Sequence, residues 1–427
     1  MNLSQIKPHE ICSIRPPTEN FSLTFRLTRN CYWNKCWYCP VYKFGTKFSK
    51  RSLVDIKEDI ANVKKLYDLL LTNGLFNIYD STMINIKVQE LINKINKAKE
   101  NDNICDQVHV EKLSENIDPK LKWFLTWFKE KPTLADSISH ILTWKAYGDN
   151  NCFIGDSDSL ILKPDFFRQV MDEIKKHFPD IERFTVYGRT STAARNRTIK
   201  DLEAFRDGGL NRVHFGLESG CDKVLRFIHK GITSIEHIEG GVKTRESGLS
   251  CSVYVMPGLG GANWSEMHSY DTADVLTKIS PDYIRLRTLQ IFPQTMLEDA
   301  LKNVSFIEAS EEQIVKEIKV LIENINTETE IISDSATNLL NVNGKLPDDK
   351  EKMLNTINDY LKLSPFEKLK FSLESRINSF IGQYGGLTPD IMDELSPFVY
   401  HNRLNVFENH RDQIINIIRK IRAKLMP

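Results

Sequence analysis

Three cysteines lie within nine residues of this 427-residue chain: Cys31, Cys36 and Cys39, spaced Cys-x4-Cys-x2-Cys. Three clustered thiolates can ligate three irons of a [4Fe–4S] cluster. The fourth iron then has no protein ligand and can bind another molecule. An open iron beside a substrate cavity indicates chemistry rather than simple electron transfer.

Zinc binding is the first alternative for these cysteines. A structural zinc site usually has four ligands in two closely spaced pairs, and the nearest histidine here is His9. A chance group of buried thiols is the second alternative, but three thiols in one loop after a strand argue against it. We therefore favour an iron–sulfur cluster, with a non-catalytic iron–sulfur or zinc protein as the rival hypothesis.

Short β-rich runs alternate with helical patterns, which is typical of a parallel sheet built from βα units. The first predicted strand runs straight into the cysteine loop, and Ser52 begins a predicted helix that Gly74 ends. Six such units predict an α/β fold, a partial (β/α)6 barrel of the TIM type. Functional residues of such folds lie at the carboxyl ends of the strands. The six predicted strands cover residues 21–28, 151–155, 183–187, 211–216, 250–256 and 283–289.

The pattern of alternating strands and helices divides the chain into three predicted parts. Residues 1–20 form an N-terminal extension, residues 21–300 the barrel, and residues 301–427 a helical C-terminal region. Within the barrel, residues 75–145 are rich in Lys, Asn and Glu and are predicted to be a helical insertion. Near the C-terminus, an amphipathic pattern places a stripe of apolar residues toward a core; they are Ile414, Ile418, Ile421 and Leu425.

Composition excludes several classes of protein. Lys plus Arg and Asp plus Glu number 57 each, so the net charge is zero, which argues against a dedicated nucleic-acid binder. The eight cysteines show no repeated paired spacing of a secreted disulfide framework. No apolar leader pattern and no run of membrane-spanning length is present. The sequence therefore predicts a protein of the reducing cytoplasm.

The cysteine motif, with the aromatic Tyr38 before Cys39, resembles that of the radical S-adenosylmethionine (SAM) superfamily. The commonest form of that motif has three residues in the first gap, whereas this chain has four, YWNK. The wider gap resembles a group of uncharacterised proteins near the oxygen-independent coproporphyrinogen oxidases. Residues 333–354 resemble a C-terminal segment of the same group. The resemblance leaves the substrate open.

The resemblance implies SAM-binding residues after the second and third predicted strands. Gly155, Asp156 and Ser157 stand where the family has a Gly-Gly-Glu motif that holds the methionyl amino group. Arg189, after the third strand, could pair with the SAM carboxylate by a bidentate contact. The alternatives are a turn with a helix start for the first segment and a surface salt bridge for Arg189.

Three later segments follow in the order that the resemblance implies. Glu218 and Ser219, in HFGLESG, would lie beside the ribose and methionine parts of SAM. Gly258, in VMPGLGG, would lie on the adenine side, where glycine permits close backbone approach. Thr288 could touch the adenine edge. A solvated turn is the alternative for the Glu218 segment.

The implied activity is that of a radical SAM enzyme with a [4Fe–4S] cluster on Cys31, Cys36 and Cys39. A flavodoxin- or ferredoxin-type donor would reduce the cluster, and reductive cleavage of SAM would give methionine and a 5′-deoxyadenosyl radical. That radical would abstract hydrogen from an unidentified substrate. A tRNA-modifying radical SAM enzyme is a further alternative, but it predicts a basic C-terminal domain, which the balanced charge does not show.

Overall fold

An eight-stranded sheet forms the centre of the molecule in the computed structural model. The model describes residues 2–12, 14–43, 47–102, 117–125, 132–148, 150–399 and 410–425. Seven strands run parallel as neighbours, and the last strand is antiparallel to the seventh. In sheet order they are β1 (Leu23–Arg26), β4 (Asn151–Gly155), β5 (Arg183–Gly188), β6 (Arg212–Glu218), β7 (Ser250–Val255), β8 (Tyr283–Leu286), β9 (Thr329–Ile332) and β10 (Gly344–Leu346).

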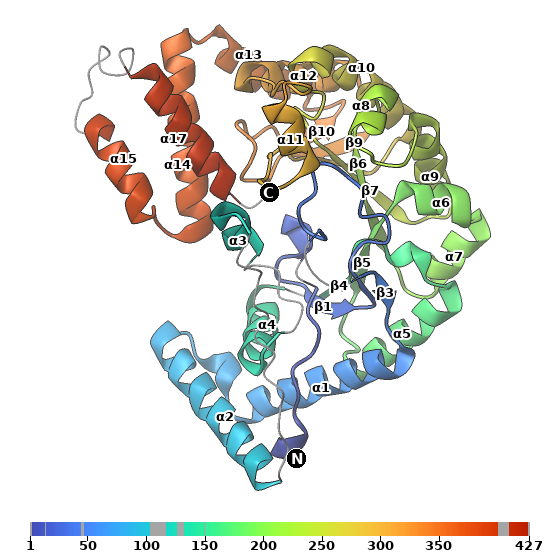
Figure 1. The fold of residues 1–427 in the computed structure, drawn as a ribbon. Coiled ribbons are helices and arrows are strands. Elements are labelled where there is room, and N and C mark those ends of the chain that lie inside the picture. Colours follow the sequence, from blue (N-terminus) through green and yellow to red (C-terminus); the bar gives the residue numbers. More distant parts are fainter. Residues whose placement is uncertain are drawn as a thin grey trace.

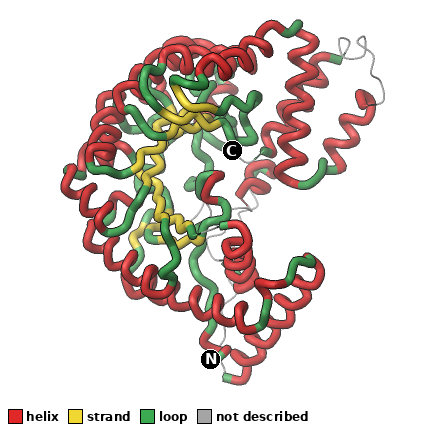
Figure 2. The backbone as a smooth tube through the Cα atoms, turned by 180° about the vertical axis from the view of Figure 1, so that it is seen from behind, coloured by secondary structure: helices red, strands yellow, loops and turns green. Residues whose placement is uncertain are grey.

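The sheet is an open arc, with helices on its outer side (Figures 1 and 2). The edges of the sheet are β1 and β10, so the barrel does not close. All six predicted strands are present, which confirms the α/β partial-barrel fold; β9 and β10 are additional strands that the sequence analysis did not predict. The helices that follow the strands are α5 (Pro164–His177), α6 (Thr190–Asn196), α7 (Ile199–Asp207), α8 (Asp222–Phe227), α9 (Ser234–Glu246), α10 (Gly261–Ile279), α11 (Met296–Lys302), α12 (Glu311–Asn324) and α13 (Lys350–Lys362).

Alternation along the strands separates an apolar outer face from a polar inner face. Residues of one parity, such as Val186, Phe215 and Val253, belong to the main hydrophobic core between the sheet and the helices. Residues of the other parity, such as His214 and Tyr254, are buried but lie outside that core. The inner side of the arc therefore carries polar side chains.

The cysteine segment is a loop whose base is closed by a short hairpin. Strand β2 (Thr28–Arg29) pairs antiparallel with β3 (Ser49–Lys50), so the intervening residues form one loop. Helix α1 (Leu53–Thr72) follows, and the hydroxyl of Ser52 accepts the amide hydrogen of Asp55 as its N-cap, as predicted. The cysteine loop is thus held between β1 and α1.

Most of the described residues between α1 and β4 are helical. Helices α2 (Ser81–Asn101), α3 (Pro119–Leu125) and α4 (Leu134–Tyr147) lie here, and α4 contacts α1, β1 and α2. Short 3₁₀ turns complete the chain, namely η1 (Leu3–Gln5), η2 (Pro17–Glu19), η3 (Leu75–Asn77) and η4 (Ser159–Ile161).

The C-terminal helices form a second, smaller core beside the open side of the sheet (Figure 1). They are α14 (Pro365–Tyr384), α15 (Pro389–Val399) and α17 (Arg411–Lys424). The predicted apolar stripe is buried here, with Ile414, Ile421 and Leu425 fully inaccessible. The main core also continues past residue 300, through residues such as Leu321 and Ile331. The division of the chain at residues 20 and 300 stays a prediction.

Within the described part of the chain, no helix is both long and apolar enough to span a bilayer.

Candidate active site

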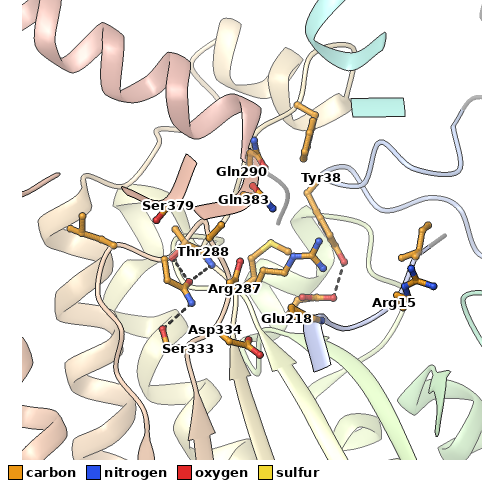
Figure 3. Close-up of a pocket in the computed structure, with 18 of the residues that line it drawn as sticks. Arg15, Tyr38, Glu218, Arg287, Thr288, Gln290, Ser333, Asp334, Ser379 and Gln383 are labelled. Atoms are coloured by element: carbon orange, nitrogen blue, oxygen red, sulfur yellow. Dashed lines mark hydrogen bonds between the residues drawn. The ribbon is translucent and has the colours of Figure 1, made fainter. Parts of the chain in front are cut away.

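A cavity of about 660 Å³ opens at the carboxyl ends of the strands (Figure 3). Glu218 is the last residue of β6, Met256 follows β7 directly, and Arg287 and Thr288 follow β8; all four line the cavity. The cysteine loop supplies a further part of the wall, from Tyr38 to Tyr42. This volume is typical of sites for small-molecule ligands.

Segments distant in sequence complete the wall of the cavity. Its other lining residues come from the N-terminal segment around Arg15, from Gln290 and Phe292 after β8, from residues 333–341 and from α14. Asn338 connects residues 333–341 to the end of β8, because its side-chain amide donates a hydrogen bond to the carbonyl of Leu286 at 2.8 Å. Part of the segment 333–354, for which the sequence analysis noted a resemblance, thus lines the cavity.

Aromatic side chains fix the cysteine loop to the residues after α8. The indole N–H of Trp33 donates to the carbonyl of His229 at 2.8 Å, and the amide of Trp37 donates to Ile228 at 2.9 Å. The Trp37 ring also stacks on the His229 ring, with centroids 4.8 Å apart. Gly231 packs against Trp33 so closely that a Cβ there would lie 2.0 Å from its ring. The loop is therefore positioned by packing as well as by its β2–β3 base.

The three loop cysteines are free thiols that lie within electrostatic reach of one another. Cys36 is buried, and Cys31 and Cys39 are half-buried. Burial first, and then the negative charges of Cys36 and Cys31, raise the pKa of Cys39 to about 11. Among the described residues, no three His, Cys, Asp or Glu side chains are grouped closely enough to hold a metal ion. A four-iron cluster is larger than one ion, so its ligands stand further apart than those of a mononuclear site.

Tyr38 links the cysteine loop to the end of β6. Its hydroxyl donates to Oε1 of Glu218 at 3.2 Å, and the Lys230 ammonium lies 3.2 Å from the same oxygen and 3.0 Å from the phenol oxygen. Burial and the charge of Glu218 raise the pKa of Tyr38 well above its usual value. Glu218 has a φ of 66° beside a register shift in β6, so its side chain leaves the regular pleat and reaches the cavity.

Asp156 is held by an ion pair rather than standing open to the cavity. The Arg26 guanidinium lies 2.8 Å from Oδ2, and both side chains are almost fully buried. The amide of Asn30 donates to Oδ2 and the hydroxyl of Tyr42 donates to Oδ1, each at 2.8 Å. Asp156 therefore ties β4 to the start of the cysteine loop, and it reaches the cavity wall through Tyr42.

Arg189 lies against the other side of the cysteine loop. Its guanidinium sits 5.6 Å from the ring centroid of Tyr32 and 5.4 Å from that of Trp33, and it donates to the carbonyl of Lys230 at 2.7 Å. Burial lowers the pKa of Arg189, but the negative charges of Cys36 and its neighbours more than offset this and raise it. A cation is thus placed beside the thiols.

Gly155 and Ser157 flank Asp156 and have structural contacts of their own. A Cβ at Gly155 would lie 1.9 Å from Sγ of Cys12, so no larger residue fits there. The hydroxyl of Ser157 donates to the carbonyl of Asn30 at 3.0 Å. Both residues therefore position the turn after β4 against the N-terminal segment and the cysteine loop.

Ser219, Gly258 and Thr288 mark the ends of β6, β7 and β8. The hydroxyl of Ser219 lies 2.8 Å from Nδ1 of His268, and Ser219 is fully buried. Gly258 has a φ of 88°, which favours glycine, and its amide donates to Glu317 at 2.6 Å. Both the amide and the hydroxyl of Thr288 donate to Oδ1 of Asn338 at 2.9 Å.

The cavity brings together only part of the predicted set. Four predicted residues line it, namely Tyr38, Cys39, Glu218 and Thr288. The remaining predicted residues surround it or the cysteine loop without lining the wall; they are Cys31, Cys36, Gly155, Asp156, Ser157, Arg189, Ser219 and Gly258.

Sequence reasoning missed four charged residues at the site: Lys230, Arg15, Arg287 and Asp334. A signal existed for Arg287, since Arg285 and Arg287 alternate with Ile284 and Leu286 and so share the inner face of the strand and its extension. Lys230 and Arg15 stand in irregular segments, where no periodicity indicates the direction of a side chain.

A sequence model of the radical SAM superfamily matches residues 126–273. The match begins after the cysteine loop, so the family signal and the three cysteines are separate observations. It covers β4 to β7 and most of α10, which includes Asp156, Arg189 and Glu218. No curated protein matches the sequence.

Solved structures similar to this one include those of Elp3, HydG and HemN. Elp3 from the archaeon Methanocaldococcus infernus is 16% identical with a TM-score of 0.38; the match covers 52% of this chain and 57% of that chain, little more than half. HydG, a maturase of the [FeFe]-hydrogenase, is 11% identical with a TM-score of 0.39, covering 99% of this chain and 78% of that chain. Coproporphyrinogen III oxidase (HemN) from Escherichia coli is 12% identical with a TM-score of 0.30, covering 64% and 77%. At such scores we draw nothing about function from these similarities.

Proposed function

We propose that this chain is an enzyme of the radical SAM superfamily, whose sequence model matches residues 126–273. In this proposal Cys31, Cys36 and Cys39 hold a [4Fe–4S] cluster, and SAM binds beside it in the cavity. The observation that carries the proposal is that Cys39 and Glu218 line one cavity at the carboxyl ends of the strands. A matched family segment and a separate cysteine loop thus meet at one site.

The residues present fit such a group. Three free thiols on one loop supply the donor set, and thiolate is the ligand that iron–sulfur clusters take. Arg189 places a positive charge beside the loop, which stabilises thiolates and a cluster of negative charge. The bound cluster and SAM would supply reductive cleavage of the sulfonium and a 5′-deoxyadenosyl radical for hydrogen abstraction from the substrate.

The protein's part is to orient SAM and exclude water. Glu218, held in place by Tyr38 and Lys230, would accept hydrogen bonds from the amino or ribose groups of SAM. Thr288 would border the adenine edge and Arg189 the carboxylate end. The segment around Asn338 and helix α14 cover the cavity and would keep the reaction from solvent.

The remaining predicted residues would position the loops around SAM rather than contact the reacting atoms. Asp156, flanked by Gly155 and Ser157, would fix the start of the cysteine loop near the methionyl end of SAM through its contacts with Asn30 and Tyr42. Ser219 and Gly258 would hold the backbone at the ribose and adenine sides. We also propose a flavodoxin- or ferredoxin-type electron donor.

The test is anaerobic reconstitution with iron and sulfide, followed by dithionite and SAM. We expect about four irons per chain and formation of 5′-deoxyadenosine. The variants C31A, C36A and C39A should lose both, whereas C251A, a buried free cysteine on β7, should keep both. Zinc content without SAM cleavage, or cleavage by the triple variant, would overturn the proposal.

A further inference from the structure

Four charged side chains, apart from the cysteines, line the cavity: Arg15, Glu218, Arg287 and Asp334 (Figure 3). The two acids already have cations, since Glu218 lies 3.2 Å from the Lys230 ammonium and Asp334 lies 3.3 Å from the Arg285 guanidinium. Neither arginine forms an ion pair with a carboxylate among the described residues. The cavity therefore presents positive charge that the protein itself does not neutralise.

Arg15 lies in the N-terminal segment near Glu19, whose carboxylate is already engaged by other residues. Its Nη1 atom is buried without a hydrogen-bond partner among the described residues. Burial lowers the pKa of Arg15, and the nearby Cys12 and Glu19 only partly offset this. Glu19 is engaged by Arg183 at 3.2 Å and by the hydroxyl of Ser22 at 2.6 Å. A guanidinium in this position has a cost of desolvation that an anionic ligand would remove.

Arg287 extends from the end of β8 over the polar inner face of the sheet. Burial raises the pKa of Tyr254 on the neighbouring strand. Arg285 and Arg287 are close enough that their positive charges partly oppose this rise. The Tyr254 hydroxyl is buried and has no hydrogen-bond partner among the described residues. A neutral phenol donor thus accompanies the unpaired guanidinium.

We propose that the substrate of this cavity carries an anionic group, a carboxylate or a phosphate, that Arg15 and Arg287 bind. This rests on the proposed function and places the substrate in the same cavity as SAM. Guanidinium suits these groups because its planar fork donates two parallel hydrogen bonds to two oxygens of one anion. Neither arginine belongs to the residues that we assign to SAM.

The test measures binding of two anion probes, glutarate and inorganic pyrophosphate, to the reconstituted, SAM-loaded protein by calorimetry. We expect one probe to bind the unaltered protein, and R15Q and R287Q to weaken it roughly tenfold each. R287K should keep part of the affinity, since it retains the charge but not the fork. R168Q, an exposed arginine on α5, is the matched control and should bind as the unaltered protein does.

Three results would overturn the proposal. They are binding of neither probe, equal loss in R168Q, and loss of SAM affinity in R15Q and R287Q as large as the loss of probe affinity. The last result would assign the arginines to the SAM carboxylate. Arginine-dependent probe binding in a protein that does not cleave SAM would support the anion site and refute the radical SAM proposal instead, so the two failures are distinguishable.

Discussion

The phenol of Tyr38, the residue before Cys39, donates a hydrogen bond to Glu218 at the end of β6, with 3.2 Å between the oxygens. This contact joins two segments that are 180 residues apart in the sequence. It connects the loop that carries the thiols to the segment that the family model covers. The geometry of the site therefore depends on this link.

Replacement of Glu218 should impair SAM cleavage without loss of the cluster. E218Q keeps the size of the side chain but removes the charge, which leaves the Lys230 ammonium without its anion. We expect the rate of 5′-deoxyadenosine formation to fall by roughly tenfold or more, at unchanged iron content. E266Q, an exposed glutamate on α10, is the control. Cleavage by E218Q at the rate of the control would contradict the assigned role.

Replacement of Asp156 should destabilise the fold. D156N removes the nearer anion of the buried Arg26 and leaves only Glu10, at 4.0 Å; breaking such a buried pair costs about 3–5 kcal/mol. Urea unfolding of D156N and of D274N would measure the difference, because Asp274 pairs with Lys278 on the surface of α10. Loss of that exposed pair should cost under about 1 kcal/mol. Equal stabilities of the two variants would refute the structural role of Asp156.

The raised pKa of Glu317 predicts that the free energy of unfolding depends on pH in a specific way. Burial raises the pKa of Glu317 to about 7, although Ser265 and the amide of Gly258 donate to the carboxylate. The folded state then holds this proton more tightly than the unfolded state, whose pKa is the usual 4.5. The contribution of Glu317 to the free energy of unfolding is therefore most favourable below pH 4.5 and declines until about pH 7, by about 3 kcal/mol.

The measurement is the free energy of unfolding of the protein and of E317Q between pH 4.5 and 8. The variant has no proton to release at this position, so its curve should lack this decline. The difference between the two curves isolates Glu317 from all other titrating groups. Parallel curves would show that Glu317 titrates at its ordinary pKa.

A methyl group at Gly231 should disturb the cysteine loop by displacing Trp33. G231A places a Cβ 2.0 Å from the Trp33 ring at a φ of 72°, so Trp33 must move. We expect about 1–3 kcal/mol of destabilisation and a lower iron content after reconstitution. G386A is the control, because nothing lies within 4 Å of its added Cβ. Full iron content in G231A would show that Trp33 does not position the loop.

Sequence patterns predicted the central strands because each combines apolar residues with a clear turn or helix start. Strand β9 escaped prediction because Thr329–Ile332 lies between a helix and a polar loop, without a longer apolar run around it. The cysteine loop was found from the spacing of its cysteines, and the strand pattern of residues 21–28, which runs straight into it, gave its place after β1. The pairing of Tyr38, Glu218 and Lys230 could not be predicted, because the bend of β6 and the return of the chain after α8 bring them together.

The measurement that tests the central claim most directly is the electron paramagnetic resonance spectrum of the dithionite-reduced, reconstituted protein before and after addition of SAM. If SAM binds at an iron that the three loop cysteines leave open, the g values of the reduced [4Fe–4S] cluster should shift on its addition. E266Q should show the same shift, and C39A should give no such cluster signal. A cluster spectrum that SAM leaves unchanged in the unaltered protein would contradict the account.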